Sequence, residues 1–260
     1  MSFGLGHGRT LDDAPGVVGI GESELGPLPD DVLERPDAAR VDPRVWFAEP
    51  ERPFELEIGS GKGTFLVQEA QHRRDVNFLG IEWAREFYLY AADRVRRHRA
   101  GADDPAAGAL GSLTHVRMLH TDATQFIKWR VPPGICSVIH LYFSDPWPKT
   151  RHHKKRVIQD WTLAEFWRVL EPGGELRVVT DHDALWAWDV EHFDRWCSSE
   201  SDIPGWAGPR PAFRRGPFLP PASAGDGELV GTNFERKFID EGRGFHGCIL
   251  TKLAPSPTTA

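Results

Sequence analysis

A run of apolar, acidic and basic residues in the middle of the chain could hold an anionic substrate next to a reaction. Residues 137–143 are apolar, β-branched and aromatic, which is typical of a buried strand. The strand must end at Asp145, because the prolines at 146 and 148 cannot continue a hydrogen-bond ladder. Cations then follow with no acidic residue among them: Lys149, Arg151, Lys154, Lys155 and Arg156. We therefore expect a carboxylate, a rigid aromatic turn and a cationic segment to lie together.

A glycine-rich turn supplies the second group of candidate residues. Residues 54–58 read as a strand, residues 59–63 are Gly-Ser-Gly-Lys-Gly, and a helical pattern runs from residue 64 to about 72. Glycines let the backbone turn sharply and approach a ligand closely, although a plain tight turn is the alternative. Thr64 follows the third glycine, so the dinucleotide fingerprint GxGxxG is not met. With Glu57 in front, the pattern is the ExGxGxG of S-adenosylmethionine-dependent methyltransferases, where the acid faces the amino end of the methionine moiety.

Two further acids end predicted strands. Glu82 closes the strand at residues 77–82, where a doubly wound fold presents a carboxylate to ribose hydroxyls. It indicates a nucleoside without saying which one, because NAD enzymes share this device, and a surface glutamate is the plainer alternative. Asp122 follows the third strand, near residues 115–119, and resembles the acid that methyltransferases have in this place, in contact with the adenine amino group or beside it.

Composition narrows the class of protein. The chain has 260 residues, a net charge of −7 and three scattered cysteines without a CxxC pair. These features indicate no disulfide framework and no metal site, and the charge argues against indiscriminate nucleic-acid binding. No run of about 18 apolar residues and no secretory leader is found, so we expect no membrane span and a cytoplasmic location.

Strand and helix patterns alternate along the chain. Residues 1–45 are rich in Gly, Pro and Asp and predict a flexible tail, with 46–260 as a single domain. Helices are expected at 84–99, after 123, at 157–170 (ended by Pro172-Gly173-Gly174) and at 183–197, and a strand at 175–180. Residues 101–111 read as a loop, 202–228 as an excursion, and 231–239 with 245–253 as a hairpin. The fold class is therefore α/β: a Rossmann-like, seven-stranded methyltransferase sheet, mostly parallel with an antiparallel last strand, and helices on both faces.

Together these residues resemble the bacterial tRNA (guanine-N7-)-methyltransferase family over roughly residues 50–253. The most specific match is Phe143-Ser144-Asp145-Pro146-Trp147-Pro148-Lys149 with the cations behind it. Ser144 stands where proline is usual in the family. Thr232-Asn233-Phe234-Glu235 and Thr180-Asp181 are further matches.

The resemblance implies methylation of guanosine 46 in the variable loop of tRNA, with S-adenosylmethionine as the cofactor. It implies cofactor contacts by Glu57, Gly59, Gly61, Glu82, Asp122 and Asp145. It implies substrate contacts by Lys149, Asp181, Thr232, Asn233, Phe234 and Glu235. It implies RNA contacts by Arg151, His152, His153, Lys154, Lys155 and Arg156. The oligomeric state, monomer or homodimer, stays open.

Guanine N7 carries a lone pair and no proton, so no general base is needed. Positive charge develops on the guanine ring during attack, and we expect Asp145 to be the catalytic residue that stabilises it electrostatically. A small-molecule N-methyltransferase would not need the basic run, and a dehydrogenase would not need the Asp-Pro-Trp-Pro segment. A catalytically silent RNA-binding protein on the same fold is the alternative from another class, against which the intact acids count.

Overall fold

The computed structural model describes residue 11 and residues 19–100 and 113–254, without the side chains of 98–100, 233 and 234. Its strands are β1 (Gly19–Gly21), β2 (Phe54–Ile58), β3 (Asn77–Glu82), β4 (Val116–His120), β5 (Cys136–Tyr142), β6 (Leu170–Thr180), β7 (Phe213–Pro217) and β8 (His246–Lys252). They form one sheet in the order β1-β4-β3-β2-β5-β6-β8-β7. β8 runs antiparallel to both of its neighbours, and the other pairs are parallel.

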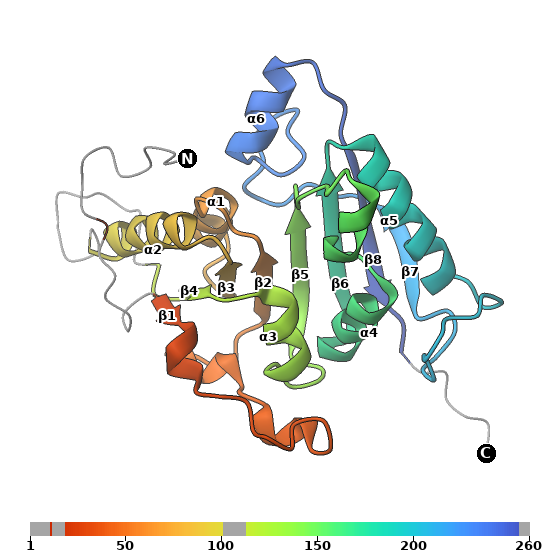
Figure 1. The fold of residues 1–260 in the computed structure, drawn as a ribbon. Helices are drawn as coiled ribbons and strands as arrows, with labels where there is room; N and C mark the ends of the chain where they lie inside the picture. Colours follow the sequence, from red (N-terminus) through yellow and green to blue (C-terminus); the bar gives the residue numbers. More distant parts are fainter. Residues whose placement is uncertain (1–10, 12–18, 101–112, 255–260) are drawn as a thin grey trace.

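Helices cover both faces of this sheet (Figure 1). They are α1 (Thr64–His72), α2 (Arg85–Ala100), α3 (Ala123–Trp129), α4 (Asp160–Val169), α5 (Asp183–Trp196) and α6 (Asn233–Asp240). Four 3-10 helices are η1 (Glu22–Leu25), η2 (Pro36–Ala39), η3 (Pro43–Trp46) and η4 (Thr150–Lys155). Side chains of α1 and α2 pack in one core cluster, and those of α3, α4 and α5 pack in another. The expected α/β fold class is confirmed, with β1 as an additional eighth strand.

The central strands are buried on both faces, although β2 carries Glu55 and Glu57 and β3 ends in Glu82. Every residue of β2 and β3 is buried, as expected for parallel strands that helices cover on both faces. Along β3 the side chains alternate between the two clusters: Phe78 packs with α1 and α2, while Leu79 and Ile81 pack in the other core. This alternation fixes which face each strand residue supplies.

The predicted hairpin at the end of the chain is wrong. Residues 233–240 form α6, and β8 pairs with β7, which comes from the excursion at 202–228. Thr232 caps α6, because its Oγ1 accepts a hydrogen bond of 3.1 Å from the backbone N–H of Glu235. In Figure 1, α6 lies beyond the tips of β5 and β6.

The prediction that Pro172-Gly173-Gly174 ends a helix is also wrong. Helix α4 ends at Val169, and these three residues lie in β6, beside the register shift between β5 and β6. A Cβ on Gly174 would lie 2.9–3.1 Å from three backbone carbonyl oxygens. The glycines therefore allow two backbones to approach each other closely.

The described part of residues 1–45 lies against the domain. β1 pairs with β4, and the backbone N–H of Val41 donates to the carbonyl of Arg130 over 2.6 Å. Arg40 donates to the carbonyl of Lys128 over 2.5 Å. These contacts differ from the expected tail, and they arise because the edge of β4 and the end of α3 offer unpaired backbone groups. The division at residue 45 stays a prediction, and the expected loop at 101–111 lies outside the described residues.

Within the described residues, no helix is long and apolar enough to cross a membrane. In the same part of the chain, no cluster of three His, Cys, Asp or Glu side chains could hold a metal ion.

Candidate functional site

The carboxyl ends of β2 and β5 meet where the strand order reverses. β2 has β3 on one side and β5 on the other, and helices follow these strands on opposite faces. In open α/β sheets a ligand crevice forms at this switch point. The glycine turn follows β2 and the turn with Asp145 follows β5, so the fold brings the two candidate groups together.

The glycine turn requires its glycines. Gly59, Gly61 and Gly63 have φ values of 74°, 53° and 67°, a left-handed conformation that other residues rarely adopt. The backbone N–H of Gly59 donates to the carbonyl of Ile81 over 2.8 Å, which ties the turn to the end of β3. A Cβ on Gly63 would lie 3.0 Å from the Cβ of Ala91 in α2. The turn is therefore closely packed and is not a loose loop.

Glu57 is a buried carboxylate with an unused oxygen. The side chain is 5% exposed, and within the described structure its Oε2 has no hydrogen-bond partner. Burial, with a contribution from the charge of Glu82, raises the pKa of Glu57 to about 8, and a hydrogen bond from Ser60 acts in the opposite direction. A cationic group placed beside this oxygen would repay the cost of its burial.

The two other predicted cofactor acids already hold backbone groups. Glu82 accepts hydrogen bonds of 2.8 Å from the backbone N–H groups of Gly61 and Ala84. Asp122 caps α3, because its Oδ1 accepts from the N–H groups of Thr124 and Gln125. Each acid therefore shapes the local backbone, and each still has lone pairs that a ligand hydroxyl or amino group can use.

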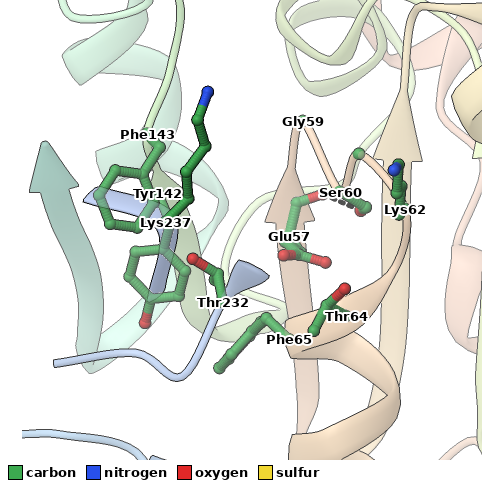
Figure 2. Close-up of a pocket in the computed structure, with 11 residues that line it drawn as sticks. Glu57, Gly59, Ser60, Lys62, Thr64, Phe65, Tyr142, Phe143, Thr232 and Lys237 are labelled. Atoms are coloured by element: carbon green, nitrogen blue, oxygen red, sulfur yellow. Dashed lines mark hydrogen bonds between the residues drawn. The ribbon is translucent and has the colours of Figure 1, made fainter. Parts of the chain in front are cut away.

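Two cavities lie against this constellation. The larger, of about 390 Å³, is lined by Gly59, Gly61, Glu82, Asp122 and Asp145 among others. The smaller, of about 230 Å³, contains Glu57 and Thr232. Gly59, Gly61, Tyr142 and Phe143 line both. In Figure 2, Tyr142, Phe143, Thr232 and Lys237 lie across the smaller cavity from Glu57, Thr64 and Phe65.

Asp145 lies on a strained turn at the larger cavity. Phe143 and Trp147 have φ values of 53° and 41°, a conformation that costs roughly 1–3 kcal/mol for each non-glycine residue. Asp145 itself is exposed, and its carboxylate has no hydrogen bond or ion pair to any described residue. The aromatic turn thus presents a free carboxylate at the cavity mouth, and Ser144 lies in the turn without breaking it.

Three cations of the predicted RNA-contacting run are exposed, as is the neighbouring Lys149, and one cation of the run is not. Lys149, Arg151, Lys154 and Lys155, which we call the cationic segment, face solvent on and beside η4. Lys155 Nζ lies 4.6 Å from the centre of the Trp147 ring, and His152 and His153 are partly exposed.

Arg156 corrects the prediction for this run. It is 4% exposed and donates over 2.9 Å to the carbonyl of Pro146, so it holds the turn in place and does not reach solvent. Burial lowers the pKa of this guanidinium, and the charge of Asp189 partly compensates.

The residues predicted to contact the substrate also include one that is buried and held by internal contacts. Glu235 is fully buried, and its carboxylate accepts from the backbone N–H groups of Leu229, Val230 and Gly231. It therefore fixes a loop and has no free face for a substrate, which corrects the prediction.

The other predicted substrate residues are spread around the site. Of those whose side chains are described, only Thr232 lines one of these two cavities. Lys149 is exposed, and Asp181 forms a 2.8 Å ion pair with Arg243. The side chains of Asn233 and Phe234 lie outside the description.

Sequence reasoning missed several residues of the cavity walls. Tyr142 lines both cavities, Lys62 and Lys237 line the smaller one, and Trp83, which is 68% exposed, lines the larger one. Trp83 directly follows Glu82, and Tyr142 lies three residues before Asp145. Their places at strand ends were the available signal, because such side chains meet at the edge of a parallel sheet.

Comparisons with known proteins agree with this arrangement. Residues 51–206 match a family model described as putative methyltransferase. A tRNA (guanine-N(7)-)-methyltransferase of Nitrobacter hamburgensis is 35% identical over 59% of this chain and 55% of its own length. A protein of the same description from Alkalilimnicola ehrlichii is 31% identical over 81% of this chain and 77% of its own length.

Coverage of these relatives is incomplete. The chain spans 54–59% of the length of four relatives with this description, one of which is the Nitrobacter protein. The solved structure of the 16S rRNA methyltransferase KamB is 16% identical, with a TM-score of 0.47 over 88% of this chain and 95% of that one.

Proposed function

Because the chain belongs to the tRNA (guanine-N7-)-methyltransferase family, we propose that it transfers a methyl group from S-adenosylmethionine to N7 of guanine in tRNA. The nucleotide proposed is guanosine 46 of the variable loop, and the compartment is the cytoplasm. The observation that carries the proposal is the unpartnered, buried Oε2 of Glu57, in a cavity that shares its walls with the cavity of Asp145.

The residues at the two cavities fit S-adenosylmethionine. Glu57 offers its unused oxygen to the methionine ammonium group, and the two cavities of about 390 and 230 Å³ lie on either side of shared walls. Glu82 would accept from ribose hydroxyls and Asp122 from the adenine amino group, with the exposed Trp83 indole available to cover the adenine. The bound cofactor supplies an electrophilic methyl group.

The work left to the protein is alignment and electrostatics. Guanine N7 attacks through a lone pair, so no residue has to remove a proton. Asp145, free of other partners among the described residues, would lie beside the guanine ring and stabilise the positive charge that develops there. The strained turn between Phe143 and Trp147 keeps this carboxylate in place without reorganisation during the reaction.

Basic groups near the cavities would hold the RNA. The cationic segment lies directly after the turn, and Lys237 lines the smaller cavity from α6. Ammonium groups act as point charges on phosphates, whereas Arg151 can make bidentate contacts. A basic patch on an otherwise acidic protein favours a localised RNA contact over indiscriminate binding.

The assay that tests the proposal is transfer of a tritiated methyl group to unmodified tRNA, followed by strand cleavage selective for N7-methylguanosine. Label that enters tRNA and maps to position 46 is the expected result. Cofactor binding by calorimetry without any label transfer would indicate a catalytically silent RNA-binding protein. Label transfer to a small molecule but not to tRNA would indicate a small-molecule N-methyltransferase.

Asp145→Asn separates chemistry from binding. The substitution keeps the size of the side chain and removes its charge, so we expect turnover at saturating tRNA to fall by about 100-fold while tRNA affinity stays within about twofold. Single-turnover kinetics and filter binding measure the two quantities. A loss of affinity with normal turnover would contradict the role given to Asp145.

A further inference from the structure

A buried series of polar contacts begins at Tyr142, which lines both cavities. The hydroxyl of Tyr142 lies 2.8 Å from Nδ1 of His140, whose Nε2 lies 2.8 Å from Oε2 of Glu55. The other oxygen of Glu55 forms a 2.7 Å ion pair with Arg73. His140 and Glu55 are each 1% exposed, and they belong to the adjacent strands β5 and β2.

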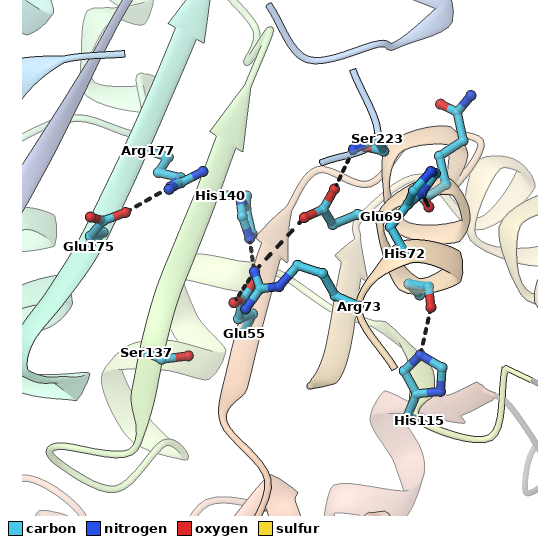
Figure 3. Close-up of polar contacts among 12 residues, drawn as sticks. Glu55, Glu69, His72, Arg73, His115, Ser137, His140, Glu175, Arg177 and Ser223 are labelled. Carbon is cyan, nitrogen blue, oxygen red and sulfur yellow. Dashed lines mark hydrogen bonds and ion pairs between the residues drawn. The ribbon is translucent and has the colours of Figure 1, made fainter. Parts of the chain in front are cut away.

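The polar contacts continue from Arg73 to Glu69 and Ser223 (Figure 3). The Arg73 nitrogen that pairs with Glu55 lies 3.8 Å from Oε1 of Glu69, and Oε2 of Glu69 accepts from the backbone N–H of Ser223 over 2.9 Å. Ser223 belongs to the 221–232 loop, which ends at Thr232 in the cavity wall. Polar contacts therefore link two strands and α1 to a loop distant in sequence.

The protonation states of the end groups determine which atoms donate and which accept along these polar contacts. Burial would raise the pKa of Glu55, but the contacts with His140 and Arg73 outweigh it and hold the pKa below its usual value. An ionised Glu55 only accepts, so Nε2 of His140 carries the proton that faces it. The Tyr142 hydroxyl is the partner of Nδ1 on the other side of the ring, and burial raises the pKa of Tyr142 and keeps its proton in place.

Apolar packing completes the link between Tyr142 and the 221–232 loop. Tyr142 packs with Phe65 and Val230 in a small cluster of buried side chains, and Leu229 packs against it. The ring of Phe65 lies 5.0 Å from the ring of Tyr142, edge to face. A chain of ionised groups is costly to bury, and apolar residues of similar volume would hold the strands at a lower cost. Directional contacts, by contrast, fix the rotation of a ring and the place of a loop.

We propose that Glu55, His140 and Arg73 are positioning residues that orient the Tyr142 ring and the 221–232 loop, both of which contribute to the wall of the smaller cavity. The expected effects on turnover rest on the proposed function. Displacing Tyr142 misaligns the groups held in both cavities, so turnover falls while RNA binding at the exposed cationic segment is retained.

Tyr142→Phe tests the orientation of the ring, since it removes one oxygen and keeps the packing. We expect kcat to fall about tenfold and the KM for tRNA to stay within about twofold. His140→Leu should cause a similar or larger fall. Combining the two should cost no more than His140→Leu alone, because both break one contact. Unchanged kcat in Tyr142→Phe, or fold-losses that multiply in the double variant, would overturn the proposal.

Glu55→Gln tests the link to the loop by hydrogen exchange, with neither cofactor nor tRNA present. Loss of the charge on Glu55 releases Arg73, so we expect amides of the 221–232 loop to exchange about tenfold faster. Unchanged exchange there would refute this link even if His140→Leu failed to fold.

His115→Gln is the matched control, because His115 is also buried and its Nε2 contacts only the carbonyl of Ala70 over 2.9 Å. It should lower the melting temperature without changing kcat or loop exchange. If the wild-type protein transferred no methyl group to tRNA, the proposed function would fail, and the exchange measurement would still decide the structural part.

Discussion

Two buried carboxylates of this protein have similar burial and similar pKa values but different roles. Glu57 and Asp189 are 5% and 1% exposed, each has an oxygen without a partner among the described residues, and burial raises both pKa values to about 8. Only Glu57 lines a cavity. The positive charge of Arg156 favours the ionised form of Asp189. A ligand can therefore repay the burial of Glu57, while Asp189 depends on the protein alone.

Glu57→Gln should stabilise the protein without cofactor. The pKa of Glu57 rises from 4.5 in the unfolded chain to about 8 on folding. The folded state thus binds more protons between these values, and wild-type stability falls as pH rises toward 8. The gain from Glu57→Gln should be small at pH 4.5, grow to a few kcal/mol (roughly) by pH 8 and then level off. Urea unfolding at several pH values measures it.

Asp189→Asn controls for burial alone. It should give a similar pH-dependent gain and keep the affinity for S-adenosylmethionine, whereas Glu57→Gln should lose at least tenfold in that affinity by calorimetry. Equal cofactor affinity in the two variants would remove Glu57 from the binding site.

Residue type alone could not separate ligand contacts from internal ones. Glu57, Glu82 and Asp122 were found from their places relative to predicted strands, and the structure brings all three to the cavities. Arg156 looked like its exposed neighbours, but its burial depends on α5, a helix that follows much later in the chain. Glu235 likewise looked free, because its partners are backbone N–H groups that carry no sequence signal.

At the scale of elements, strands were predicted better than the C-terminal helix. β2 and β3 match the predicted ranges, since short stretches rich in apolar residues and bounded by turn residues leave few alternatives. α6 was taken for a strand, although Thr232 and Glu235 have the spacing of a helix capping pair and Phe234 and Phe238 are four residues apart. Residues 235–237 are three consecutive polar residues, which do not fit the alternation of a half-buried strand.

The segment around η4 should divide its cations by role. Arg151→Ala with Lys154→Ala removes two exposed charges, so tRNA binding should weaken and its salt dependence should flatten by about one unit for each lost phosphate contact. Filter binding over a range of salt concentrations measures the slope. Arg156→Lys serves as the buried counterpart. It should lower the melting temperature and turnover but leave the slope unchanged, and a changed slope would return Arg156 to the RNA surface.

At the scale of the whole molecule, the alternation of strands and helices was enough to predict the class of fold. The order of the seven later strands follows from right-handed crossovers and a reversal at β2 and β5. The segments of the sequence that form the outer strands could not be predicted. β7 comes from a Pro- and Gly-rich excursion and β1 has three residues, and both are strands only because a neighbour provides a partner.

The short pairing of β1 with β4 has a consequence for solubility. Without it, β4 would be the last strand on that side, with unpaired backbone groups beside the apolar residues Met118 and Leu119. Exposed edges of this kind recruit strands from other molecules. Deleting residues 1–21 should therefore make the protein associate as its concentration rises, as measured by light scattering, and a protein that stayed monodisperse would argue against this role. The other edge, β7, carries Arg214, Arg215 and Pro217, which discourage such pairing. By covering the edge of β4, β1 would then protect the protein against aggregation.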